Sequence, residues 1–133
     1  MRTLVIATDG SPSAREAVAF GLGLAHELDA AVVFAHVACG HGGERLPLEE
    51  ATASARSRGV SATTEVLVGD PADEIVAYAD SIDADAIVVG TRGHGGIAGA
   101  LLGSVSQRVL CDARRPVLVV PRTARREDGA PAD

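Results

Sequence analysis

A glycine-rich segment near the middle of the C-terminal half carries the strongest chemical pattern of the chain. It reads Gly90-Thr91-Arg92-Gly93-His94-Gly95-Gly96, and after a short apolar run it continues as Gly103-Ser104-Val105. Glycines let backbone N–H groups turn toward an anion, and the N-terminus of a following helix adds the positive end of its dipole. The pattern predicts a cradle for phosphate groups.

Three side chains of this segment can add to such a cradle. Arg92 can make a charge-assisted contact with an anion. His94 can reach a phosphate, or be an exposed loop histidine. Ser104 can cap the following helix or give its hydroxyl to a phosphate. The alternative for the whole segment is an ordinary flexible loop between a strand and a helix, because glycine-rich turns are common in α/β folds.

Other ligand-binding patterns fit this chain less well. Gly93 to Ala98 match a loose G-x-G-x-x-A dinucleotide pattern, but they follow the fourth strand instead of the first, and no acidic residue ends a strand about twenty residues later. A Walker A loop is excluded, because it needs a lysine and all twelve basic residues are arginines. His41 and Glu44 lack partners at ligand spacing, so no metal held by the protein is expected.

A second candidate position follows the first apolar run. Leu4, Val5 and Ile6 are typical of a parallel strand that is buried on both faces, and Asp9 comes just after it. Ligands of open α/β sheets bind beyond the carboxyl ends of the strands. Asp9 can therefore accept hydrogen bonds from ribose hydroxyls or approach a metal. Its alternative role is that of a turn or cap aspartate.

The elements that must position these residues alternate along the chain. Apolar runs and alternation predict strands over residues 2–8, 31–37, 60–68, 86–89 and 117–120. Periodicity and cap signals predict helices that start near Pro12 and at Pro71, and helices over 47–58 and 103–115. This order implies an α/β fold, an open five-stranded parallel sheet with helices on both faces.

Local signals specify how the helices begin and which side faces the core. Pro12 suits a first turn, Ser13 with Glu16 makes a capping box, and Asp70 caps the third helix. The residues expected to face the core are Ala14, Ala17, Val18, Gly21, Ala25 and Leu28 in the first helix, Ile75, Ala79 and Ile82 in the third, and Val105, Val109 and Leu110 in the fourth.

Composition limits the class of protein. The 133 residues suit one domain, which we expect over 1–122, followed by a disordered tail over 123–133. A net charge of −6 argues against nucleic acid and anionic membranes as partners. No apolar run reaches the roughly eighteen residues of a membrane span, and the N-terminus lacks the layout of a signal peptide. A cytoplasmic protein is expected.

The exact spacing of the glycines resembles a known signature. Gly90-x2-Gly93-x9-Gly103-Ser104, followed by Val105, resembles the nucleotide-binding signature of the universal stress protein family. The resemblance continues at 117–120, 6–11 and His36-Val37, and covers roughly residues 1–122. The subgroup that carries this glycine pattern typically binds ATP.

The resemblance implies a fold, a ligand and an assembly. It implies a Rossmann-like sheet, similar to adenine nucleotide alpha hydrolases, with strand order 3-2-1-4-5. It implies ATP or another adenine nucleotide, with Mg²⁺ or Mn²⁺ held by the phosphates. Members of this family commonly dimerise through the fifth strand, so a homodimer through Val117–Val120 is expected, in keeping with an apolar edge strand open to pairing.

The resemblance also assigns residues to the parts of the nucleotide. Asp9 would hold the ribose, while Ala7, Thr8 and the backbone of Val37 would line the adenine. The positions expected around the ribose and phosphates are Gly90, Arg92, Gly93, His94, Gly95, Gly96, Gly103, Ser104 and Val105. His36 is expected to be a packed residue and not a ligand.

Three functions stay open from the sequence. The first is a regulator that senses an adenine nucleotide in a stress response. The second is a slow ATPase or phosphotransferase, which needs positioned charge and an oriented nucleophile, although the loop offers no obvious base beyond Asp9 or His94. The third is an interaction module that binds no nucleotide.

Overall fold

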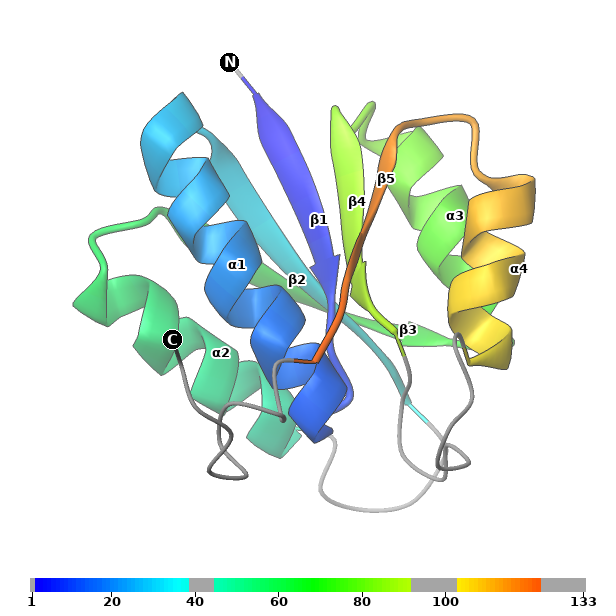
Figure 1. Ribbon diagram of the computed structural model, residues 1–133, viewed down its shortest axis with the longest axis horizontal. Coiled ribbons are helices and arrows are strands. Elements are labelled where there is room, and N and C mark those ends of the chain that lie inside the picture. Colours follow the sequence, from blue (N-terminus) through cyan, green and yellow to red (C-terminus); the bar gives the residue numbers. More distant parts are fainter. Residues whose placement is uncertain (1, 39–44, 92–102, 123–133) are drawn as a thin grey trace, which may run out of the picture.

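A single parallel sheet organises the part of the chain that the computed structural model describes, residues 2–38, 45–91 and 103–122. Its strands are β1 (Thr3–Ala7), β2 (Ala31–Ala38), β3 (Ala62–Val68), β4 (Ala86–Gly90) and β5 (Val117–Val120). The helices between them are α1 (Pro12–Leu28), α2 (Arg45–Ser57), α3 (Pro71–Ser81) and α4 (Ser104–Asp112). The strand order is β3-β2-β1-β4-β5, so the predicted fold and order are confirmed (Figure 1).

The sheet separates two apolar cores. Figure 1 shows α1 and α2 on one face of the sheet and α3 and α4 on the other. Along β1, Leu4 and Ile6 pack with residues of α1 and α2, whereas Val5 packs with residues of α3 and α4. Burying each such side chain stabilises the fold by roughly 1.5–3 kcal/mol. The two edge strands, β3 and β5, are the less buried ones, as predicted.

Two helix starts follow from short-range capping. Asp70 caps α3 as predicted, because its Oδ2 accepts from the backbone N–H of Asp73 at 3.1 Å. The predicted capping box of Ser13 and Glu16 is wrong. The cap of α1 is Ser11, whose Oγ accepts from Ala14 N at 3.2 Å, since Pro12 already occupies the first helical position. Ser13 lies inside the helix and is buried.

The predicted inward faces of α1 and α4 need correction at their ends. Leu28 of α1 is 37 % exposed, and Val105 and Leu110 of α4 are 37 % and 42 % exposed, whereas Val109 is fully buried. Helix α4 also ends at Asp112 instead of Arg115, because Ala113 is already extended with ψ 143°. Residues before a proline avoid helical angles, and Pro116 follows closely.

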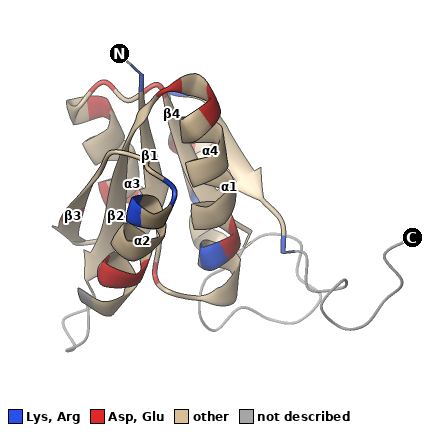
Figure 2. Ribbon diagram, turned by 90° about the vertical axis from the view of Figure 1, so that its left-hand side faces the viewer, with Lys and Arg blue, Asp and Glu red and all other residues tan. Residues whose placement is uncertain are grey.

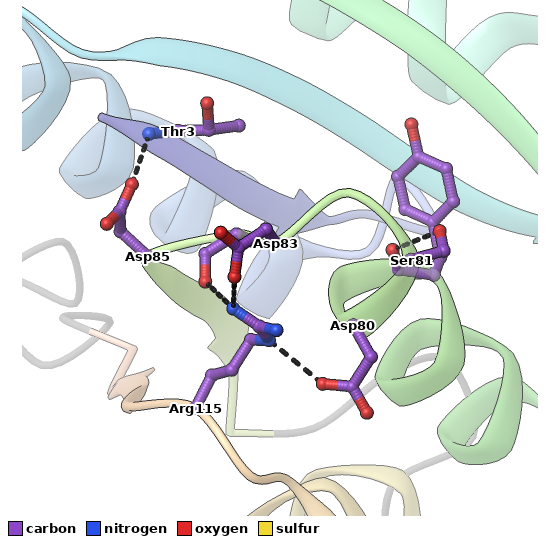
Figure 3. Close-up of polar contacts among 8 residues, drawn as sticks. Thr3, Asp80, Ser81, Asp83, Asp85 and Arg115 are labelled. Carbon is purple, nitrogen blue, oxygen red and sulfur yellow. Dashed lines mark hydrogen bonds and ion pairs between the residues drawn. The ribbon is translucent and has the colours of Figure 1, made fainter. Parts of the chain in front are cut away.

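A cluster of polar contacts ties the starts of the strands together (Figure 3). Arg115 Nε donates to Asp80 at 2.9 Å, and its Nη1 donates to Asp83 at 2.9 Å. These hydrogen bonds raise the pKa of Arg115. Thr3 N donates to Asp85 Oδ2 at 2.8 Å. Asp83 and Asp85 therefore connect elements distant in sequence, at the end of the sheet opposite the strands' carboxyl ends.

The surface charge is dispersed. Figure 2 shows acidic residues spread over several helices and turns, with few basic ones between them. The formal net charge of the chain is −6. Across the residues described, no helix combines the length and the apolar character that crossing a membrane requires.

Candidate functional site

The sheet brings the two candidate segments of the sequence to one place. Strand β1 lies between β2 and β4, and the chain reverses its direction of travel across the sheet between these neighbours. Ile6 of β1 is in register with Val88 of β4. The residues that follow β1, including Asp9, therefore lie beside the end of β4. Open α/β sheets bind ligands at such a reversal point, beyond the carboxyl ends of the strands.

The turn after β1 is built from its own side chains. Gly10 has φ +80°, a left-handed conformation that glycine adopts at little cost. Asp9 Oδ1 accepts from Ser11 N at 2.9 Å, and Thr8 Oγ1 accepts from Gly10 N at 3.2 Å. Asp9 thus has a turn role of the kind considered from the sequence. A carboxylate has further acceptor positions, so this role leaves it able to accept from a ligand as well.

The end of β4 is packed directly against the first turn of α1. A Cβ atom at Gly90 would lie 2.6 Å from Ser13 O and 2.7 Å from Ser13 Oγ. Thr91 Oγ1 lies 3.1 Å from Ser13 Oγ, within hydrogen-bond distance. The structure therefore supplies a packing reason for glycine at position 90, besides the proposed contact with an anion.

Helix α4 is attached to the same strand end at its N-terminus. Gly103 N donates to Thr91 O at 2.6 Å, and Ser106 Oγ donates to Gly90 O at 2.6 Å. Gly103 is the N-cap and supplies no side-chain cap, so of the two alternatives for Ser104 the cap role is wrong. Ser104 and Val105 are exposed residues of the first turn. Backbone N–H groups of a first turn without a side-chain cap are suited to an anion.

The end of β2 lies on the other side of β1. Ala7 is in register with Ala35, and Val37 follows two residues later. His36 is buried, and its Nδ1 lies 2.9 Å from Thr8 O, so it is the packed residue that the sequence predicted. Thr8 is buried as well. The ends of β1 and β2 thus bring Ala7, Thr8 and Val37 together.

Part of the expected site lies outside the described residues. The expected ligand positions concerned are Arg92, Gly93, His94, Gly95 and Gly96. The expected tail over 123–133 also lies outside them.

Exposed ion pairs join the helices on each face of the sheet. Arg15 Nε lies 3.1 Å from Glu50, and Arg108 contacts Asp70 at 2.8 Å and Asp73 at 2.6 Å. The backbone N–H of Asp73, together with Arg108, holds the pKa of Asp70 below its ordinary value. The bond to Asp70 in turn raises the pKa of Arg108. These pairs join α1 to α2 and α4 to the start of α3.

In α3, burial raises the pKa of the Tyr78 hydroxyl, and the negative charge of Glu65 in β3 raises it further. Within the described ranges, no group of three or more His, Cys, Asp and Glu side chains is placed to hold a metal ion.

Three polar residues of this region were not predicted from the sequence to belong to the site. They are Ser13, Thr91 and Ser106, whose hydroxyls connect α1, β4 and α4. Thr91 could have been found as the first polar residue after a buried strand. Ser13 and Ser106 lie on helices, and their partners are distant in sequence, so only the tertiary structure identifies them.

Comparison with known proteins agrees with this arrangement. The model of the universal stress protein family matches residues 1–51 and 40–121. The universal stress protein MJ0531 of Methanocaldococcus jannaschii is 36% identical over 140 residues, which cover 91% of this chain and 82% of that protein.

Two solved structures with bound nucleotides share the fold. A universal stress protein in complex with cAMP is 30% identical, with a TM-score of 0.76, over 92% of this chain and 98% of that chain. The universal stress protein of Archaeoglobus fulgidus in complex with dAMP is 28% identical, with a TM-score of 0.69, over 90% of this chain and 97% of that chain. The family model and the M. jannaschii relative each cover most of the sequence, and this chain belongs to the universal stress protein family.

Proposed function

We propose that this chain binds ATP or another adenine nucleotide and acts as a nucleotide-dependent regulator in a stress response. The observation that carries the proposal is the attachment of α4 to the end of β4. Gly103 N donates to Thr91 O at 2.6 Å, and this bond holds a helix N-terminus without a side-chain cap at the end of β4. Strand β4 is the neighbour of β1, the strand that precedes Asp9. Complexes of two family members with cAMP and dAMP support an adenine ligand.

The proposed contacts follow the order of the strand ends. The phosphates lie at the first turn of α4 with Ser104 and at the glycine-rich segment with Arg92 and His94, and they carry Mg²⁺ or Mn²⁺. The ribose lies against Asp9. The adenine lies beyond Ala7 and Thr8, where the backbone of Val37 can read its edge. We propose that residues 1–122 form the single domain that holds this ligand.

The regulator is favoured over the enzyme by what surrounds the proposed phosphates. Among the described residues of the site, Asp9 is the carboxylate that could act as a base, and the proposed contacts place it against the ribose and not beside the phosphates. Phosphoryl transfer needs a base or an oriented water in line with the phosphate. Sustained phosphate release from ATP that is abolished by Ser104→Ala would favour the slow ATPase.

The chain's own absorbance provides a direct test of nucleotide binding. With no Trp and one Tyr, the protein absorbs weakly near 280 nm, so a co-purified adenine nucleotide dominates the spectrum near 260 nm. We expect this spectrum, release of an adenine nucleotide on denaturation, and a rise in melting temperature when ATP and Mg²⁺ are added to the emptied protein. A protein without bound nucleotide whose melting temperature ATP does not change would contradict the proposal.

We further propose a homodimer through the open edge of β5. Pro116 O accepts from Ile87 N of β4, so every second residue from Pro116 onward directs its backbone groups to β4. Val119 lies between two such residues, so its N–H points away from β4, to the open edge of the sheet. Val119→Pro removes that outward donor while sparing the β4 ladder. We expect the wild type to sediment as a dimer and Val119→Pro as a folded monomer. A monomeric wild type, or a variant that dimerises as before, contradicts this assembly.

A further inference from the structure

The hydrogen-bond ladder between β1 and β2 stops where β1 ends, three residues before the end of β2. Thr8 N donates to Ala35 O at 3.0 Å, but the register of the two strands ends at Ala7 and Ala35. In a parallel ladder the next hydrogen bond would run from Val37 N to Thr8 O and would place Thr8 in register with His36. That step is absent from the register, so the strands separate at Val37.

The side chain of His36 takes the place of the missing bond. Its Nδ1 lies 2.9 Å from Thr8 O, and the ring is only 8 % exposed. A carbonyl oxygen can only accept, so Nδ1 must carry the proton of this hydrogen bond. The imidazole thereby pairs with Thr8 O. Without it, Val37 N–H would donate to this oxygen, because buried carbonyls are almost always hydrogen-bonded.

The backbone groups of Val37 consequently point past the end of β1. Residues two apart in a strand direct their backbone groups to the same neighbour, and Ala35 directs its groups to β1. Val37 N–H and C=O therefore point to the β1 side, just past the last paired residue. One donor and one acceptor side by side match the N1 acceptor and N6 donor of adenine, whereas guanine presents the reverse order.

We propose that His36 is a positioning residue that keeps the Val37 peptide unpaired and available to read the base. This inference rests on the proposed function and deepens it, because it makes recognition of the base depend on one side chain, His36, that keeps the ends of β1 and β2 apart. His36 acts through Thr8 O and does not touch the nucleotide. It lies on the α1 side of β2 with Phe34, whereas Val37 packs on the α3 and α4 side.

Two substitutions distinguish the effect of the Nδ1 donor from the effect of the volume of the ring. Asn places its amide nitrogen where His has Nδ1, so His36→Asn keeps a donor for Thr8 O. His36→Leu fills similar space without a donor. In His36→Leu we expect Val37 N–H to close onto Thr8 O and extend the ladder by one bond.

The ligand-free protein tests this closure by amide hydrogen exchange. We expect Val37 N–H to exchange faster than Ala35 N–H in the wild type and in His36→Asn, and to slow by at least about fivefold in His36→Leu, the effect of one added hydrogen bond. Nitrogen chemical shifts of His36 should show the proton on Nδ1. Equal exchange of the Val37 N–H in all three proteins, or a proton on Nε2 of His36 alone, contradicts the proposal that His36 keeps the strands apart.

Nucleotide affinity then tests the recognition role. In His36→Leu the dissociation constant of ATP should rise about tenfold, while that of inorganic triphosphate stays unchanged, and His36→Asn should match the wild type for both. A loss shared equally by ATP and triphosphate overturns the role, since it indicates general damage to the site. If the wild type binds neither ligand, the proposed function fails, whereas the exchange data still decide whether His36 holds the strands apart.

Discussion

Gly90→Ala is expected to destabilise the protein by about 1–3 kcal/mol, the usual cost of overfilling a packed site. The added Cβ would lie 2.6 Å from Ser13 O and 2.7 Å from Ser13 C, both backbone atoms of α1. Backbone in the first turn of a capped helix cannot move aside as a flexible side chain can. The substitution must therefore push α1 from β4 or lose the contact between Ser13 and Thr91.

Two other glycines give a matched series for this prediction. Gly23 of α1 has nothing within 4 Å of an added Cβ, so Gly23→Ala should stabilise the protein by roughly 0.5–1 kcal/mol through helix propensity. At Gly21 an added Cβ would lie 2.5 Å from Ile6 Cδ1, the end of a side chain that can rotate. Gly21→Ala should therefore fall between the other two.

Urea denaturation of the three variants measures the order of their stabilities. The midpoint should rise for Gly23→Ala and fall most for Gly90→Ala, with the slope unchanged if the unfolded states are alike. A Gly90→Ala protein as stable as Gly23→Ala would show that the close approach of Ser13 to β4 is not a real constraint.

The order of elements could be predicted because it depends on local patterns. The apolar run of β1, the Pro at the start of α1 and the Asp cap of α3 each act within a few residues, and the structure has them as expected. The strand order is a different matter. It came from the family resemblance, because spacing alone does not say which strand neighbours β1.

The errors and omissions have a common physical cause. The cap of α1 is Ser11 and not Ser13, because Pro12 occupies the first helical position, and the contact of Ser13 with the end of β4 is one that no local signal reveals. Val105 has helical spacing but faces out, since α4 is turned by its attachments at Ser106 and Gly103. The bond between His36 and Thr8 joins residues 28 apart, so it could not be read from a motif.

Asp9→Asn is expected to reduce the preference for ATP over 2′,3′-dideoxy-ATP by about tenfold. A hydrogen bond to a charged acceptor contributes more than one to a neutral acceptor, by roughly 1–2 kcal/mol. The substitution also removes a negative charge near the proposed phosphates, which can tighten both ligands. The ratio of the two affinities cancels that common effect and isolates the contact with the ribose hydroxyls, as a double-mutant cycle does.

The choice of Asn keeps the turn after β1 intact. Asn retains an Oδ1 that can accept from Ser11 N, the bond that Asp9 makes at 2.9 Å. The urea midpoint of Asp9→Asn should therefore stay close to that of the wild type, whereas Asp9→Ala should lower it. If Asp9→Asn binds both nucleotides with the wild-type ratio, Asp9 serves the turn alone, and the ribose must be held by other residues. If instead the ratio falls while stability is kept, one carboxylate both shapes the loop and recognises the sugar.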